Sequence, residues 1–432
     1  MTFKNFRKAG HPPSLIAAFL HFDMNFMVWV LIGALGIFIS QDFHLTAAQK
    51  GFLTAIPLLG GALTRIPIGL LGDRLGIKRV ALAQLVIVCL PLLWGWLGAG
   101  SCSEMLVLGL LLGVAGSSFA LALPLASRWY PPEYQGLAMG IAGAGNSGTI
   151  LASIFAPRLA KAYGWHAVFA LALGCIAVTF AAFAFLAKEP PRQGSKQGWK
   201  ELLSVFRQID SLWFSIVYSV TFGGFVGFAS FLNLFFFDQY GLNKIQAANL
   251  TALCVFSGSF FRPIGGFVSD RIGGYRALIV LLGVIAGSLA VMGTLPALAI
   301  ALPALFIMMA ALGMGNGAVF QLVPQRFAKE IGLMTGIVGA AGGFGGFFLP
   351  TLMGWVKQHT GSFGPAFWIL MGGVGFALAA LYQAQQGILR YRNKTEFSRV
   401  AAETVINVPC DGKIFVTPVE RAVTVRTGEP VL

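Results

Sequence analysis

Two arginines, Arg65 and Arg262, lie inside long apolar stretches of the sequence. Arg65 stands in LLGGALTRIPIGLLGDRLG (58–76), with no acidic residue within seven positions. A guanidinium keeps its proton at any accessible pH, and a charge at the centre of a membrane helix costs about 2.5 kcal/mol or more. Its planar fork donates paired hydrogen bonds to oxyanions. These two arginines therefore predict a buried anion site.

The surroundings of the two arginines repeat along the chain. A shift of 197 residues aligns RIPIGLLGDRLGIKR (65–79) with RPIGGFVSDRIGGYR (262–276), and a shift of 196 aligns GLAMGIAGAG (136–145) with GLMTGIVGAA (332–341). A third match, GSSFALALP with GAVFQLVP, pairs Phe119 with Phe320. Such repeats indicate a transporter that binds its substrate between two halves near the bilayer midplane. The paired positions are Arg65 and Arg262, Asp73 and Asp270, Arg74 and Arg271, Gly140 and Gly336, and Gly143 and Gly339.

Snorkelling of the two arginines to the membrane surface is the alternative to an anion site. Each arginine lies eight residues before the acidic residue of the following loop, at Asp73 and Asp270. Eight helical residues span about 12 Å, which is deeper than snorkelling easily explains. Their recurrence in both halves also favours a binding role.

The composition requires a membrane protein. Of the 432 residues, 56% are hydrophobic and only 11% charged, with a mean hydropathy of +0.77, whereas soluble domains carry about 25% charged residues. Twelve segments are long enough to cross a bilayer, so we predict an all-α membrane protein with twelve transmembrane helices in two pseudo-symmetric six-helix bundles. The segments lie near 14–39, 48–71, 79–99, 104–126, 136–160, 164–187, 211–237, 246–268, 276–296, 300–323, 332–355 and 363–388.

The basic residues predict the orientation. Alternate connections carry 23 lysines and arginines on one side and five on the other, and positive loops stay in the cytoplasm. This distribution along loops also excludes a nucleic-acid-binding face. The predicted organisation is a cytoplasmic N-terminus (1–13), a first bundle (14–187), an amphipathic cytoplasmic linker (188–210), a second bundle (211–390) and a poorly ordered cytoplasmic tail (391–432).

Two further polar residues fall inside predicted spans. Asp23, in the first span, is either a functional acid or a carboxyl group bonded to a hydroxyl or basic group. Asn146 lies in GAGNSG (143–148), which has the spacing of a dinucleotide loop but sits in a hydrophobic span without a soluble α/β unit. Asn146 is therefore either a ligand contact or an interhelical hydrogen-bonding group. The histidines and cysteines lack metal spacing, and no cofactor is expected.

The loop from Gly69 to Arg79, repeated from Gly266, resembles the loop shared across the major facilitator superfamily. The glycine-rich stretches GIAGAGNSG and GIVGAAGGFGGFFLP, with the two arginines, FMVW (26–29) and YSVTFGGFVGF (218–228), are similar to the nitrate/nitrite porters of that superfamily. This resemblance implies an anion clamp at Arg65 and Arg262. It also implies an aromatic lining at Phe26, Phe119, Tyr218 and Phe222, an amide contact at Asn146, and a gate latch at Asp73 and Arg74 with its repeat at Asp270 and Arg271.

The glycines Gly140, Gly143, Gly336 and Gly339 are expected to serve close helix packing and rocking. The resemblance implies a secondary active transporter, not an enzyme, that moves nitrate or nitrite across the inner membrane as a monomer with both termini cytoplasmic. Nitrate/nitrite exchange and proton-coupled uptake both remain open, with Asp23 as the proton-coupling candidate. A carrier for another small inorganic anion or carboxylate, and a membrane anion sensor without flux, are the alternatives.

Overall fold

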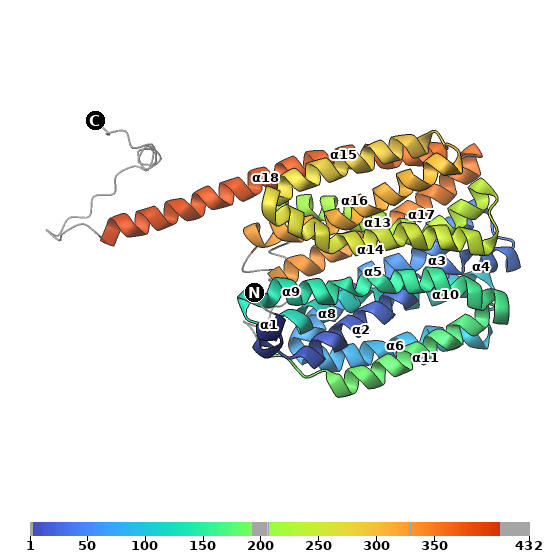
Figure 1. The fold of residues 1–432 in the computed structure, drawn as a ribbon, viewed down its shortest axis with the longest axis horizontal. Coiled ribbons are helices and arrows are strands. Elements are labelled where there is room, and N and C mark those ends of the chain that lie inside the picture. Colours follow the sequence, from blue (N-terminus) through green and yellow to red (C-terminus); the bar gives the residue numbers. More distant parts are fainter. Residues whose placement is uncertain (1–2, 192–204, 206, 328–330, 407–432) are drawn as a thin grey trace.

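The computed structural model describes residues 3–191, 205, 207–327 and 331–406, and this part of the chain is helical without strands. Within the described residues, eleven helical segments are long and apolar enough to cross a membrane. The first predicted span forms a further rod from Pro12 to Asp42, interrupted at Val30 and Leu35. Backbone hydrogen bonds from Ala34 to Val30 and from Ile39 to Leu35 continue across both interruptions. The predicted fold is therefore confirmed (Figure 1).

The N-terminal half contains several interrupted spans. The fourth span divides around the 3₁₀ segment η1, and the fifth divides around the 3₁₀ segment η2. The elements of this half are α1 (Phe3–Ala9), α2 (Pro12–Trp29), α3 (Leu31–Ala34), α4 (Gly36–Asp42), α5 (Ala47–Leu75), α6 (Ile77–Gly98), α7 (Cys102–Leu112), η1 (Gly113–Ser118), α8 (Phe119–Ser127), α9 (Pro132–Gly143), η2 (Ala144–Ser147), α10 (Gly148–Tyr163) and α11 (Trp165–Leu186).

The spans of the C-terminal half are each a single helix: α13 (Ile209–Tyr240), α14 (Lys244–Ile272), α15 (Gly274–Gly293), α16 (Leu298–Arg326), α17 (Ile331–Thr360) and α18 (Gly364–Ile406). Helix α18 continues beyond residue 390, where we expected a poorly ordered tail, and projects from the bundle (Figure 1). Residues 407–432 and most of the predicted linker lie outside the described residues.

The repeat seen in the sequence extends to the helix caps of α5 and α14. Thr46 and Asn243, which are 197 residues apart, each form a capping box with the glutamine three residues later. The two helices end at Gly76 and Gly273, where φ is +102° and +89°. Glycine adopts this conformation without the strain that a Cβ would cause. The matched caps place Arg65 and Arg262 at the same depth in the two halves.

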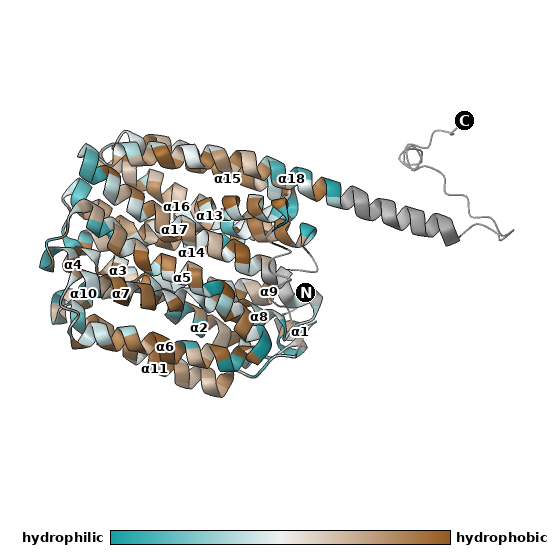
Figure 2. Ribbon diagram, turned by 180° about the vertical axis from the view of Figure 1, so that it is seen from behind, coloured by the Kyte–Doolittle hydropathy of each residue, from teal (hydrophilic) through white to brown (hydrophobic). Residues whose placement is uncertain are grey.

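Apolar residues predominate along the helices, and polar residues gather toward the two ends of the bundle (Figure 2). Leu97 and Val178 are among the exposed hydrophobic side chains of α6 and α11, and Leu90 and Phe185 lie on the same helices. Such a belt is suited to lipid rather than water. This distribution agrees with a multi-pass membrane protein.

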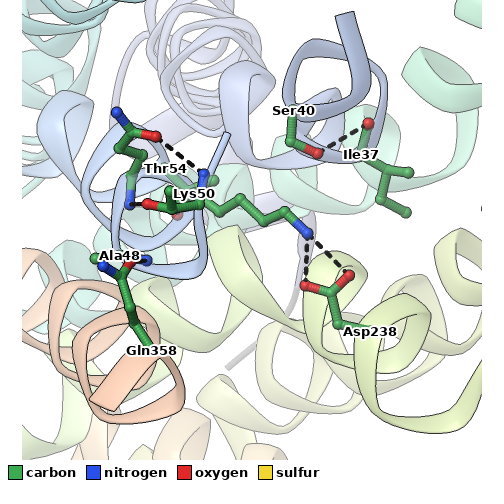
Figure 3. A network of polar contacts seen from close by, with 9 residues as sticks. Ile37, Ser40, Ala48, Lys50, Thr54, Asp238 and Gln358 are labelled. Atoms are coloured by element: carbon green, nitrogen blue, oxygen red, sulfur yellow. Dashed lines mark hydrogen bonds and ion pairs between the residues drawn. The ribbon is translucent and has the colours of Figure 1, made fainter. Parts of the chain in front are cut away.

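The two ends of the bundle differ in how the halves meet. We call the end with Gly76, Gly273 and α1 the termini face, and the end with Thr46 and Asn243 the opposite face. At the opposite face, Lys50 of α5 forms an ion pair with Asp238 of α13 at 2.9 Å, and the Gln358 side chain accepts from the Ala48 amide (Figure 3).

Two more hydrogen bonds join the halves on the same side: Arg158 donates to Asn249 and Asn233 donates to the Ala34 carbonyl. Polar contacts described at the termini face, such as Arg128 with Asp73 and Arg326 with Asp210, each stay within one half. The protein is therefore closed at the opposite face.

Candidate functional site

Arg65 is fully buried on α5, between the two halves. Its Nη2 donates to the Gly116 carbonyl of η1 at 2.6 Å, and its Nη1 donates to the Gly339 carbonyl of α17. The guanidinium carbon lies 5.5 Å from the Trp29 ring centroid and 5.4 Å from those of Phe119 and Phe222. These ring faces stabilise a cation. Two carbonyls and three rings thus hold Arg65 in place of a carboxylate.

The Gly116 carbonyl is held in position by a polar pair outside the site. Gln84, the one polar residue among those buried on α6, donates from Nε2 to the Val114 carbonyl at 2.7 Å and to the Ser117 hydroxyl at 2.8 Å. Ser117 in turn donates to the Val114 carbonyl. A 3₁₀ segment has poorer internal hydrogen-bond geometry than an α-helix. These side chains therefore help fix the shape of η1.

Arg262 lies on α14 in a less enclosed setting. It is partly buried, and its guanidinium carbon is 5.8 Å from the Phe119 centroid. Its Nη1 is buried without a hydrogen-bond partner among the described residues. The Tyr218 hydroxyl lies beside it, also without a hydrogen bond of normal geometry. Among the described residues, no aspartate or glutamate is within 4.0 Å of either guanidinium.

The predicted aromatic residues gather around the arginines. Tyr218 and Phe222 stack on each other with centroids 5.1 Å apart, and Phe320 meets both Tyr218 and Phe119, at 5.3 and 6.0 Å. Phe26 is fully buried behind this layer, where its ring packs against Trp29 and Phe222. Phe26 thus supports the rings that contact Arg65.

Asn146 and Asp23 occupy neighbouring positions at the break in the fifth span. The Asn146 amide is buried, and neither its nitrogen nor its oxygen has a partner among the described residues. An unpaired buried amide costs about 1–3 kcal/mol, which favours a ligand contact over interhelical bonding. Asp23 instead accepts a hydrogen bond from the Ser147 hydroxyl at 2.6 Å.

The four glycines expected at packing positions differ in their surroundings. A Cβ on Gly339 would lie 2.9 Å from Cδ of Arg65, whereas Cβ atoms on Gly140, Gly143 and Gly336 would meet nothing within 4 Å. Gly339 alone of the four is therefore required for a close approach in this conformation.

The predicted gate residues of the two halves make different contacts. Asp73 forms an ion pair with Arg128, the residue after α8, at 2.6 Å. Arg74 and Asp270 are exposed and make no ion pair among the described residues. Arg271 lies over the ring of Phe267 on its own helix. The structure therefore joins one of the two repeated loops to a neighbouring helix.

Several site residues escaped the sequence reasoning. The carbonyls of Gly116 and Gly339 carry no side-chain signal. Trp29 belongs to FMVW, and its spacing of three from Phe26 places both residues on one helix face. The sequence could therefore have predicted Trp29 as a site residue. Gln84 was signalled as a lone amide in an apolar span. Among the described residues, no group of three or more histidines, cysteines or acids is arranged to hold a metal.

Comparisons with known proteins identify the family of this chain. Residues 15–350 match the family model described as Major Facilitator Superfamily, and the chain belongs to that superfamily. Crystal structures of a bacterial homolog of the human lysosomal transporter Spinster, in inward-facing occupied and unoccupied conformations, superpose with TM-scores of 0.63 and 0.65. They share 20% identity and cover 87% of this chain and 97% of theirs, which supports the fold.

Within the superfamily, the chain is a member of the nitrate/nitrite porter family. It is 34% identical to a Bacillus subtilis "Nitrite extrusion protein" over 80% of this chain and 87% of the relative. It is 31% identical to a Thermus thermophilus "Probable nitrate/nitrite antiporter NarK1", over 84% and 88%. It is 36% identical to a Staphylococcus carnosus "Probable nitrate transporter NarT", over 78% and 87%.

Proposed function

We propose that this protein transports nitrate and nitrite by alternating access, with Arg65 and Arg262 as the anion clamp. The observation that carries the proposal is the pair of guanidiniums beside the Phe119 ring, neither of which has a carboxylate partner among the described residues. An anion supplies the missing negative charge, and a planar oxyanion matches the geometry of the two forks. The names of the relatives favour nitrate and nitrite over other small anions.

The other predicted side chains complete the binding site. The hydroxyl of Tyr218 and the amide of Asn146 donate hydrogen bonds to anion oxygens, and Phe119 and Phe222 exclude water from the clamp. Phe26 acts through the rings in front of it. These assignments follow from unpaired polar atoms that are buried beside the arginines, because such atoms gain most from a ligand.

Exchange of the two anions is the transport mode that the site supports best. An empty site with two arginines and no counter-anion opposes reorientation, and either anion relieves this cost. Inward movement of one anion alone would cost about 2.3 kcal/mol per 100 mV of inside-negative potential. Swapping nitrate for nitrite moves no net charge.

Proton-coupled uptake is the second candidate, and Asp23 is the residue that favours it. Its carboxyl group is buried in the first span against Ser147, one residue after Asn146. Protonation of Asp23 would change this contact and thereby the position of Asn146. In the exchange mode, the Asp23–Ser147 bond serves only to fix α2 against η2.

We also propose that the protein lies in the inner membrane with both termini in the cytoplasm, since the basic loops cluster at the termini face. The structure is then closed to the outside and corresponds to an inward-facing carrier. Asp73 and Arg128 join the loop after α5 to the end of α8 and act as part of a cytoplasmic latch. The site is complete within one chain, so a monomer suffices.

Counterflow in proteoliposomes tests the function and the coupling together. We expect labelled nitrate to accumulate when nitrite is trapped inside at clamped pH, and a panel of other anions to compete weakly. Accumulation driven by an imposed pH gradient without internal nitrite would establish the proton-coupled mode, and its loss in Asp23→Asn would assign that residue. A protein that binds nitrate but shows no flux would be a sensor rather than a carrier.

A further inference from the structure

Asn316 is a buried amide on α16 that none of the sequence motifs singled out. It is fully buried, and neither its side-chain nitrogen nor its oxygen has a hydrogen-bond partner among the described residues. An amide offers two donors and two acceptor lone pairs, and leaving them unmade in an apolar interior costs free energy. A bound ligand that pairs with the Asn316 amide would remove this cost, which makes Asn316 a candidate for ligand contact.

The neighbours of α16 show which way Asn316 points. Gly313 and Gly317 face α14, because a Cβ on either would strike the backbone of Gly258 or Arg262. Leu312 and Gly315 face α13, where they meet Gly224 and Thr221. At 100° per residue, Asn316 falls between these two directions.

Phe320, one turn after Asn316, shares its face of the helix. The Phe320 ring meets Tyr218 and Phe119, both of which surround the arginine clamp. The Asn316 side chain is therefore directed between α13 and α14 toward the same centre.

The depth of Asn316 also matches the clamp. Arg65, Arg262 and Asn316 each lie ten residues before the last residue of their helices, which end together at the termini face. Ten helical residues correspond to about 15 Å. All three side chains thus stand at one level of the bundle, together with Tyr218.

A second unpaired group lies on α13, against the residue that precedes Asn316. The Thr221 hydroxyl is buried without a partner among the described residues, three residues after Tyr218 on α13. The Thr221 methyl group faces Gly315, the residue before Asn316. The C-terminal half thus offers a hydroxyl and an amide in addition to Tyr218 and Arg262.

We propose that Asn316 is an anion-binding residue that donates a hydrogen bond to the substrate from the C-terminal half, as the counterpart of Asn146. The inference rests on the proposed nitrate/nitrite function. Two amides, one from each half, give a small oxyanion donors in more directions than the arginines alone provide.

The test is the nitrate dependence of thermal unfolding in the purified full-length protein. We expect Asn316→Ala to raise the dissociation constant for nitrate about tenfold, the effect of one hydrogen bond to a charged ligand. Asn316→Leu should lose the same affinity yet unfold, without anion, at a temperature no lower than the wild type, because it removes an unpaired buried amide. A merely structural asparagine would instead lose stability in both variants.

Asn25→Ala is the matched control. Asn25 is also a fully buried asparagine, but its amide nitrogen donates to the His21 carbonyl of its own helix. Its Oδ1 has no partner among the described residues, but an oxygen acceptor does not bind an anion, so nitrate affinity should stay at the wild-type value. Unchanged nitrate affinity in both Asn316 variants, or a strongly destabilised Asn316→Leu, would overturn the proposal while leaving the clamp intact. A wild-type protein stabilised by neither nitrate nor nitrite would refute the proposed function itself, and this inference with it.

Discussion

The two halves of the molecule share a sequence pattern but build their sides of the site differently. In the N-terminal half, the fourth and fifth spans break into the 3₁₀ segments η1 and η2, whereas α16 and α17 of the other half are continuous. The broken spans present the Gly116 carbonyl and the side-chain amide of Asn146, and the continuous helices present the Gly339 carbonyl and the ring of Phe320. A chain with two repeated halves can therefore keep its sequence pattern while the two halves adopt different local structures.

The paired arginines carry the same contrast. Arg65 is fully enclosed, bonded to two carbonyls and surrounded by three rings. Arg262 is partly exposed, touches one of these rings and keeps Nη1 unpaired. In the proposed clamp, Arg65 therefore has both a structural and a binding role, while Arg262 is available chiefly to the ligand.

Replacing the arginines by lysine should have the largest effect. We expect Arg65→Lys and Arg262→Lys each to weaken nitrate binding about 100-fold, since an ammonium lacks the planar fork. Only Arg65→Lys should also lower the unfolding temperature of the anion-free protein, because the Gly116 and Gly339 carbonyls lose their donors. Titration of the unfolding temperature with nitrate measures both quantities. Equal losses of stability in the two variants would erase the distinction between the arginines.

The paired glycines Gly339 and Gly143 give the next largest difference. Gly339→Ala brings a methyl group to 2.9 Å from Arg65 Cδ, and such overpacking costs about 1–3 kcal/mol, so nitrate uptake should fall about tenfold or more. Gly143→Ala meets nothing within 4 Å and should transport at close to the wild-type rate. Initial uptake rates in proteoliposomes compare the two directly. A more severe defect in Gly143→Ala would show that the fifth span packs tightly in another state of the cycle.

Two buried serines, Ser117 and Ser153, should separate support of Arg65 from simple burial. Ser117 bonds with Gln84 in η1, whereas the Ser153 hydroxyl donates to the Thr149 carbonyl of its own helix, α10. We expect Ser117→Ala to weaken nitrate binding severalfold, equivalent to about 1 kcal/mol, and Ser153→Ala to leave it unchanged. The same loss of affinity in both variants would mean that η1 does not depend on the Gln84 bond.

The ion pair at the opposite face should give the smallest effect. Lys50 and Asp238 are 20% and 19% exposed, and pairs of this kind contribute about 0.2–1 kcal/mol. Lys50→Ala should therefore raise the population open at that face by about fivefold or less, and the double exchange Lys50→Asp with Asp238→Lys should restore it. The labelling rate of Thr54→Cys, in a background without the native cysteines, reports this opening. If Lys50→Ala is labelled no faster than the Thr54→Cys protein that keeps Lys50, the other contacts at this face are sufficient to keep it closed.

Much of the fold followed from the sequence because membrane helices are signalled by long apolar runs. The helix caps repeat at the same spacing as the arginines, at Thr46 and Asn243 and at Gly76 and Gly273. The two-fold arrangement of the halves was therefore also predictable from the sequence. The breaks at η1 and η2 were not, since glycine-rich stretches such as GAGNSG are equally compatible with a continuous helix. The extension of α18 to Ile406 was missed because its polar composition resembles a disordered tail.

Some residues of the candidate site could be predicted from the sequence and others could not. Arg65, Arg262 and the aromatic residues were identifiable because charge and ring size mark them in an apolar span. The carbonyls that hold Arg65 were not, because every residue has one and only packing decides which of them lies free. Asn316 appeared in GMGNG without a repeat partner, and its significance depends on the rotation of α16, which the neighbouring glycines reveal only in three dimensions.

The aromatic walls around Arg65 have a consequence for the competition among anions in the cell. Trp29, Phe119 and Phe222 offer ring faces rather than hydrogen-bond acceptors or water, so an entering ion must give up most of its hydration shell. Two fixed positive charges attract chloride as strongly as nitrate at long range. The difference arises on entry, because the smaller, more tightly hydrated chloride pays more to dehydrate. In the proposed clamp, selection among anions thus begins with the cost of removing the hydration shell, before the anion oxygens accept hydrogen bonds.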